Sequence, residues 1–283
     1  MAKSKSQVLP SAAAKRFVAL FDCHVGWEWA RVGGKMVTRP THNEPAIRAT
    51  LDFVKDFAPD VLIFGGDQIN CGPVSHWLKG KPRLVEGFRL KTELDKFQEL
   101  FRDTTIHIPS TVWMDGNHEA WIHGMVDENP GLEGLLEPHE YLKGMWGTTV
   151  SQGEMYQLTT IGSPPVKSKL YFVHGDSVLA ARQYRSPARA LVEAYGRNIR
   201  AGHVHTYDVY TKKSPIDKQD YHSGIIVPAL ASRDPYYVKS APSNFMHGFL
   251  YGWFWPDGEF TDQVVVINRG TFTVNGKRYG KEK

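Results

Sequence analysis

The chain has 283 residues, of which 41% are hydrophobic and 23% are charged. This composition excludes a disordered chain, and no apolar stretch approaches the ~18 residues that a membrane-spanning helix needs. The net charge is only +4, from 34 basic and 30 acidic residues, which permits nucleic-acid binding but does not argue for it.

Two cysteines, Cys23 and Cys71, are too few for a disulfide framework and fit a reducing compartment, so we expect a cytoplasmic protein. Residues 1–15 carry basic side chains but no long apolar run, which predicts a flexible lead-in rather than a signal peptide. Because no linker or internal repeat divides the rest, residues 16–283 are predicted to form one domain.

In the first half, compact apolar runs alternate with amphipathic segments. Strands are predicted at residues 16–22, 60–64 and 111–114, and helices at residues 44–57 and 84–102. A Gly-rich loop with Trp27 and Trp29 is expected between the first strand and the first helix. This alternation is typical of an α/β sheet with its ligand chemistry at the strand ends.

The second half is richer in strands. They are predicted at residues 154–161, 169–174, 225–228, 249–255 and 263–268, with one helix at residues 186–195. Turn signals at residues 256–258 and 275–276 indicate terminal hairpins. We therefore expect two stacked sheets flanked by helices.

Polar side chains gather where the predicted strands end. The candidates are Asp22, His24, Asp67, Asn117, His118, His174, His203 and His205. Asp22 and His24 are two residues apart, as are His203 and His205, and in an extended segment each pair would point to one side.

Carboxylate, amide and imidazole ligands without thiolates suit divalent Mn, Fe, Zn, Ni or Mg. Seven ligands drawn from these eight candidates are too many for one ion with an open position, but they suit two ions that share a carboxylate. Two ions about 3.5–4 Å apart clamp the attacking and leaving oxygens of an in-line phosphoryl displacement. The pattern therefore predicts hydrolysis of a phosphate ester.

The order of these motifs along the chain resembles the calcineurin-like metallophosphoesterase superfamily. The matching segments are Asp22-Cys23-His24, Gly66-Asp67-Gln68-Ile69-Asn70, Gly116-Asn117-His118-Glu119, His174 and Gly202-His203-Val204-His205. The resemblance implies an α/β fold, a four-layer α/β/β/α sandwich of two mixed sheets flanked by helices.

The same resemblance implies roles for these side chains. One metal ion would be held by Asp22, His24 and His205, and the other by Asn117, His174 and His203, with Asp67 bridging the two. His118 would position the phosphate and protonate the leaving oxygen after in-line attack by hydroxide. Manganese is the first choice of ion, with Fe, Zn, Ni or Mg as alternatives.

The substrate class is less sharply defined. The Ser/Thr protein phosphatase branch carries GDxVDRG and RGNHE, whereas this chain has GDQINCG, and Asp115 precedes Gly116. Both diagnostic arginines are missing, so the chain resembles the phosphodiesterase and DNA-exonuclease-like branches. The prediction is a phosphodiesterase acting on nucleotides or nucleic acid, with no membrane and no obligate protein partner. A phosphomonoesterase and a non-catalytic scaffold are the alternatives.

Several neighbouring residues have two interpretations. Asn70 faces the site or forms a turn, and Asp176 orients a ligating histidine or caps a helix. Glu119 is expected to cap the helix after Asn117. Trp27 and Trp29, just after His24, are placed to touch substrate.

Two further groups are interpreted from their positions. Cys23 is expected to serve packing. The arginines before the His203 motif either recognise phosphate or lie on a solvated helix face; they are Arg182, Arg185, Arg189, Arg197 and Arg200.

Overall fold

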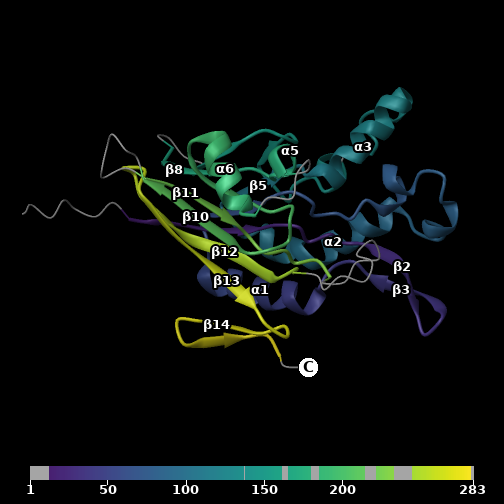
Figure 1. The fold of residues 1–283 in the computed structure, drawn as a ribbon, viewed down its shortest axis with the longest axis horizontal. Helices are drawn as coiled ribbons and strands as arrows, with labels where there is room; N and C mark the ends of the chain where they lie inside the picture. Colours follow the sequence, from purple (N-terminus) through teal and green to yellow (C-terminus); the bar gives the residue numbers. More distant parts are fainter. Residues whose placement is uncertain are drawn as a thin grey trace, which may run out of the picture.

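Two mixed β-sheets stack face to face in the structure, a computed structural model (Figure 1). It describes residues 13–136, 138–160, 165–179, 185–213, 221–232 and 244–281. The predicted lead-in falls mostly on residues 1–12, which lie outside these ranges, and the first strand already begins at Lys15.

The first sheet has six strands in the order β13-β12-β1-β4-β5-β6. Four of them run parallel: β1 (Lys15–Leu20), β4 (Val61–Phe64), β5 (Ser110–Met114) and β6 (Thr148–Val150). The hairpin β12 (His247–Phe254) and β13 (Phe260–Ile267) joins antiparallel to β1. The carboxyl ends of β1, β4 and β5 therefore meet at one edge.

The second sheet has five strands in the order β10-β11-β9-β8-β7. Its strands are β7 (Tyr156–Thr159), β8 (Lys167–Phe172), β9 (Asn198–Ala201), β10 (Asp208–Lys213) and β11 (Tyr221–Ile226). Strands β8, β9 and β11 are parallel, and β7 and β10 are antiparallel edges. Two small hairpins complete the strands: β2 (Trp27–Val32) with β3 (Lys35–Pro40), and β14 (Phe272–Val274) with β15 (Lys277–Tyr279).

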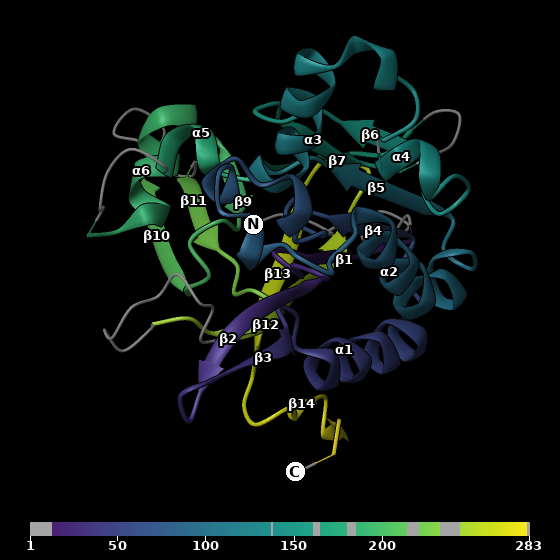
Figure 2. The same ribbon diagram turned by 90° about the vertical axis from the view of Figure 1, so that its right-hand side faces the viewer.

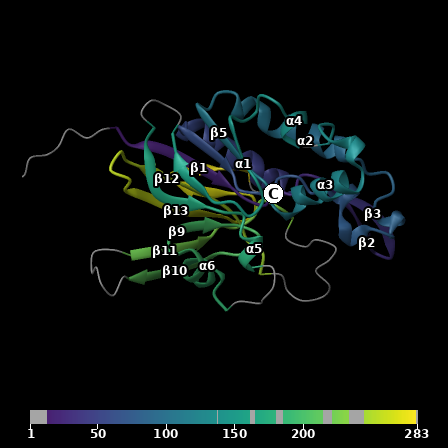
Figure 3. The same ribbon diagram turned by 90° about the horizontal axis from the view of Figure 1, so that it is seen from above.

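Helices cover the outer face of each sheet (Figures 2 and 3). The helices α1 (Glu44–Phe57) and α2 (Leu90–Thr105) cover the first sheet, while α5 (Asp176–Leu179) and α6 (Pro187–Tyr195) cover the second. The remaining helices are α3 (Asn117–Glu128) and α4 (Pro138–Tyr141), with short 3₁₀ turns at Gly72–Val74, His76–Leu78, Pro82–Leu84 and Pro130–Leu132.

Three apolar clusters hold the layers together. Alternate residues of β1 pack into two different clusters. Val18 and Leu20 pack toward α1 and α2, whereas Phe17 and Ala19 pack against the second sheet. A third cluster, with Leu191 of α6, lies on the outer face of the second sheet. The expected four-layer α/β/β/α sandwich is confirmed.

The predicted elements agree with the structure to different degrees. Helix α1 has the predicted bounds, because the Asn43 side chain accepts a hydrogen bond from the Ala46 amide at its start. The helix predicted at residues 84–102 begins only at Leu90, since Arg89 has an extended backbone. Strands β6, β9 and β10 were not predicted.

The loop predicted after the first strand is wrong. Residues Trp27–Val32 and Lys35–Pro40 form an antiparallel hairpin with a two-residue Gly33-Gly34 turn. In Figures 1 and 3 this β2–β3 hairpin and α3 lie at the same end of the molecule.

Within the described ranges, no helix is long and apolar enough to cross a membrane.

Candidate metal centre

The structure brings all eight predicted site residues together, although they come from five separate strand ends. Asp22 and His24 follow β1, Asp67 follows β4, Asn117 and His118 begin α3 after β5, His174 follows β8, and His203 and His205 follow β9. Three groups of candidate ligands have atoms within 4.8 Å of one another: Asp22, His24 and His205; His24, Asp67 and His118; Asp67, His174 and His203.

The first group is a tight cluster of buried nitrogen and oxygen atoms. The Nε2 atoms of His24 and His205 are 3.1 Å apart, and His205 Nε2 lies 3.4 Å from Asp22 Oδ1. All three side chains are almost completely buried.

Asp67 stands between this group and the second one. Its Oδ2 lies 3.3 Å from His174 Nε2, 3.7 Å from His24 Nε2 and 3.9 Å from His118 Nε2. A single carboxylate oxygen thus faces three imidazoles from three different segments of the chain.

The second group is completed by Asn117. Its Oδ1 lies 3.2 Å from His174 Nε2, and His174 Nδ1 lies 3.2 Å from the Gly65 carbonyl. An Nδ1–H that donates to this carbonyl fixes the ring with Nε2 aimed at Asp67 and Asn117.

The local backbone differs from the extended segments expected from the sequence. Asp22, His24, His203 and His205 have φ values of 51°, 46°, 67° and 57°, and Asp67 has 52°, so all five are left-handed. The extended backbone assumed for these segments is therefore wrong, although both members of each pair still point into the same cluster. Such conformations cost about 1–3 kcal/mol each and concentrate at functional sites.

Two motif glycines make room for the carboxylates. A Cβ added at Gly116 would lie 2.2 Å from Asp67 Oδ1, and one added at Gly202 would lie 2.1 Å from Asp22 Oδ2. Both contacts are too close for any side chain, so glycine is required by close approach.

Glu119 does more than the expected helix cap. Its buried carboxylate accepts hydrogen bonds from the amides of Asp67, Gln68, Ile69 and Gly116 at 2.9–3.0 Å. It therefore ties the loop after β4 to the start of α3. Burial and the nearby Asp67 and Asp115 charges raise the pKa of Glu119 to about 8, against the effect of these donors.

Burial and charge act in opposite directions across the cluster. Burial would raise the pKa of Asp67, but the surrounding imidazoles, His174 first, hold it well below its usual value. Burial would lower the pKa of His174, but Asp67 raises it to about 10. Burial lowers the pKa of His24 and His203, which favours the neutral imidazole that binds metal ions.

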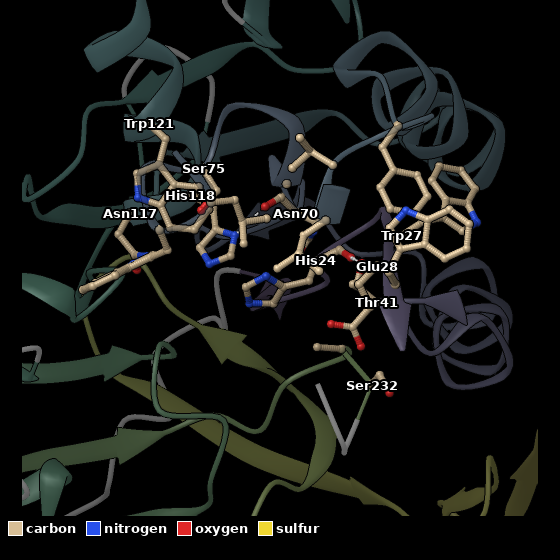
Figure 4. Close-up of a pocket in the computed structure, with 18 of the residues that line it drawn as sticks. His24, Trp27, Glu28, Thr41, Asn70, Ser75, Asn117, His118, Trp121 and Ser232 are labelled. Atoms are coloured by element: carbon tan, nitrogen blue, oxygen red, sulfur yellow. Dashed lines mark hydrogen bonds between the residues drawn. The ribbon is translucent and has the colours of Figure 1, made fainter. Parts of the chain in front are cut away.

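A cavity of about 370 Å³ opens beside the cluster (Figure 4). His24, Asn117, His118 and His205 line its inner end. Trp27 and Trp29, which were predicted to touch substrate, also line this cavity. Phe88, Trp77 and Trp121 were not assigned from the sequence, where only their aromatic character between motif residues could have suggested them.

The residues with two interpretations are now placed. The Asn70 carbonyl lies 2.6 Å from His118 Nδ1, and its side chain lines the cavity. Asp176 is the first residue of α5 and accepts a hydrogen bond from Gln152, and its negative charge acts on the nearby His174 and His203. Cys23 is fully buried in the first apolar cluster, as expected.

The predicted arginine cluster does not form a phosphate site around Arg200. That side chain is buried and pairs with Asp262 of β13, and Arg189 pairs with Glu193 on α6. Arg182 lies outside the described residues.

Comparison with known proteins identifies one family for the chain. The sequence model of the calcineurin-like phosphoesterases matches residues 16–222. No match was found among the curated proteins.

Similar solved structures share little sequence with the chain. A metallophosphoesterase from Sphaerobacter thermophilus is 15% identical, with 90% of this chain and 89% of that chain covered and a TM-score of 0.41. The E. coli phosphoesterase Yfce is 14% identical, with 89% and 100% covered and a TM-score of 0.37. A 5'-nucleotidase precursor from Thermus thermophilus is 13% identical, with 90% and 55% covered and a TM-score of 0.35.

The family match spans most of the chain, and all eight residues of the cluster at the strand ends lie within it. The chain therefore belongs to the calcineurin-like phosphoesterase family. It is a metal-dependent phosphoesterase, a hydrolase of phosphate esters, and its His and Asp cluster is a potential site for divalent ions.

Proposed function

We propose that the chain is a dinuclear phosphodiesterase acting on nucleotides or nucleic acid. Asp22, His24 and His205 would hold one ion, and Asn117, His174 and His203 would hold the other. Asp67 bridges them, which its position beside both His24 and His174 supports.

The donor set fits divalent ions. Carboxylate, amide and imidazole atoms converge within 4.8 Å in three overlapping groups. Among the described residues, the buried Nδ1 atoms of His203 and His205 have no hydrogen-bond partner. A metal ion bound to one nitrogen of either ring would leave the other ring nitrogen to form a hydrogen bond with a water or another group.

Divalent ions bound here would supply Lewis acidity, which polarises the phosphoryl oxygens and makes water acidic enough to act as a nucleophile. The oxygen of water bonds to phosphorus as the bond from phosphorus to the leaving oxygen breaks, and the proton that water releases replaces the one that His118 donates. His118 gives its Nε2 proton to that oxygen, so the products are an alcohol and a phosphomonoester. Its Nδ1–H meanwhile donates to the Asn70 carbonyl and fixes the ring.

The chemistry of the cavity walls carries the assignment to diesters. Trp27, Trp29 and Phe88 present aromatic surface in the cavity that His118 also lines, and Glu28 adds a carboxylate. A diester brings one negative charge fewer and one organic group more than a monoester. The lower negative charge of a diester suits the carboxylate of Glu28, and its additional organic group suits the aromatic surface.

The test compares initial rates on bis-p-nitrophenyl phosphate and p-nitrophenyl phosphate with Mn²⁺ added, and then with Fe²⁺, Zn²⁺, Ni²⁺ or Mg²⁺. We expect the diester to be hydrolysed faster. Asp22→Ala is the inactive reference, and Asp127→Ala, a position near the end of α3, should keep full activity. Hydrolysis of the monoester alone would make the chain a phosphomonoesterase, and no hydrolysis above the Asp22→Ala rate would make it a scaffold.

A further inference from the structure

The cavity beside the metal centre is bounded by two segments outside the sandwich core. One is the β2–β3 hairpin, and the other is the segment of residues 72–88 that connects β4 to α2. Figure 4 shows Trp27 and Glu28 on one side and Ser75, His118 and Trp121 on the other, with His24 between them. Its volume of about 370 Å³ lies in the range of small-molecule sites.

The outer wall is already fixed in position. The rings of Trp29 and Phe88 lie 5.6 Å apart, and Trp29 Nε1 donates a hydrogen bond to the Glu86 carbonyl at 3.1 Å. This bond joins the hairpin to the facing segment. A planar group that enters the cavity therefore meets aromatic surface without a large loss of side-chain freedom.

The inner end is continuous with the reaction centre. The rings of His118 and Trp121 are 4.0 Å apart, and both line the cavity. Because His118 is the proposed proton donor to the leaving oxygen, the group that occupies the cavity is the one attached to that oxygen.

Polar side chains lie among the aromatic ones. Asn70, Ser75 and Ser232 line the cavity and offer donors and acceptors to the edges of a ring. Stacking surface combined with polar edges is how proteins hold an unpaired nucleobase.

We propose that this cavity is the leaving-group subsite and that it holds a nucleoside, with the base stacked on Trp29 and Phe88. The proposal rests on the proposed diesterase function and narrows its substrates to esters that release a nucleoside. A plain aromatic alcohol is the competing occupant.

Isothermal titration calorimetry with adenosine tests this on the full chain, with and without Mn²⁺. Adenosine contains no phosphate, so its binding does not depend on hydrolysis, and the proposed function can fail or succeed separately in the nitrophenyl assays. We expect saturable binding of one adenosine per chain. Ribose should give no binding heat, and phenol should bind with at least tenfold lower affinity.

Variants locate the binding. Trp29→Ala should lower the affinity for adenosine by about tenfold or more, as expected when a stacking ring is removed. Trp29→Phe should keep most of the affinity. Val37→Ala, on the same hairpin but outside the lining, is the matched control. The proposal is overturned if adenosine gives no binding heat, if phenol binds as tightly, or if Trp29→Ala and Val37→Ala bind adenosine equally well.

Discussion

The backbone amide of His118 donates a hydrogen bond to Asp67 Oδ1 at 2.8 Å, while the other oxygen of the same carboxylate faces the imidazole cluster. The two oxygens of Asp67 thus have separate partners. One anchors the side chain to the start of α3, and the other is available to bridge ions. The proposed bridging ligand and the proposed proton donor are therefore held in one rigid unit.

This division predicts the effect of Asp67→Asn. The amide oxygen keeps the bond from His118, but an NH₂ group replaces the oxygen that faces the imidazoles and cannot bind a cation. We expect loss of both ions and of activity, measured by elemental analysis after dialysis. Asp115 directly follows β5, and its carboxylate accepts a hydrogen bond from Trp113 Nε1. The control variant Asp115→Asn should therefore retain both ions. Full metal occupancy in Asp67→Asn would disprove the bridge.

Replacement of Gly116 provides a purely steric test. The Cβ of Gly116→Ala would lie 2.2 Å from Asp67 Oδ1, so the carboxylate must move and metal content should fall. Gly124→Ala on α3 meets nothing within 4 Å and should raise helix stability by up to ~1 kcal/mol. Metal titration and thermal unfolding of both variants separate the two effects. Equal metal affinity in the two would show that the close approach is unimportant.

His118→Asn should act on chemistry rather than on metal content. The backbone amide still anchors Asp67, but the proton donor is gone, so alkyl diesters should be hydrolysed about 10²–10⁴-fold more slowly. Bis-p-nitrophenyl phosphate, whose leaving group needs no proton, should be affected far less. An unchanged rate on a dialkyl phosphodiester would remove His118 from this role.

Glu93 predicts a pH dependence of stability. It is fully buried on α2, and burial raises its pKa well above 4.5, although the amides of Cys71, Trp27 and Gly72 oppose this. None of these amides forms a hydrogen bond of ordinary geometry with the carboxylate. The folded protein therefore retains a proton that the unfolded chain has lost, and its stability falls as pH rises from 4.5 through the raised pKa.

The variant Glu93→Gln removes this titration. Its free energy of unfolding should exceed that of the wild type by about 1–3 kcal/mol above the raised pKa, and the slope between pH 4.5 and that value should flatten. Urea unfolding across this pH range measures both quantities. Glu99→Gln, an exposed position on the same helix, should leave the slope unchanged. A slope as steep in Glu93→Gln as in the wild type would contradict this assignment.

The positions of the site residues were predictable because they depend on buried strands that deliver polar side chains at their ends. Runs such as residues 61–64 are apolar throughout, and the polar residue after each run is visible in the sequence. The family motifs then grouped Asp22, Asp67 and His203 correctly, although these residues lie far apart in the chain.

Features that depend on contacts between distant residues were not predictable. The left-handed backbone at His24 is stabilised by a hydrogen bond from its amide to the Asp67 carbonyl, which no local pattern reveals. Glu119 serves as an acceptor for a loop about 50 residues earlier in the chain. The hairpin at Trp27 was missed although Gly33-Gly34 between two runs of strand-forming residues signalled it.

Anomalous diffraction from crystals grown with Mn²⁺ tests the central claim most directly. We expect two manganese peaks about 3.5–4 Å apart, one beside His24 and His205 and the other beside His174 and His203, with Asp67 between them. A single peak, or two peaks that do not share Asp67, would contradict the dinuclear centre.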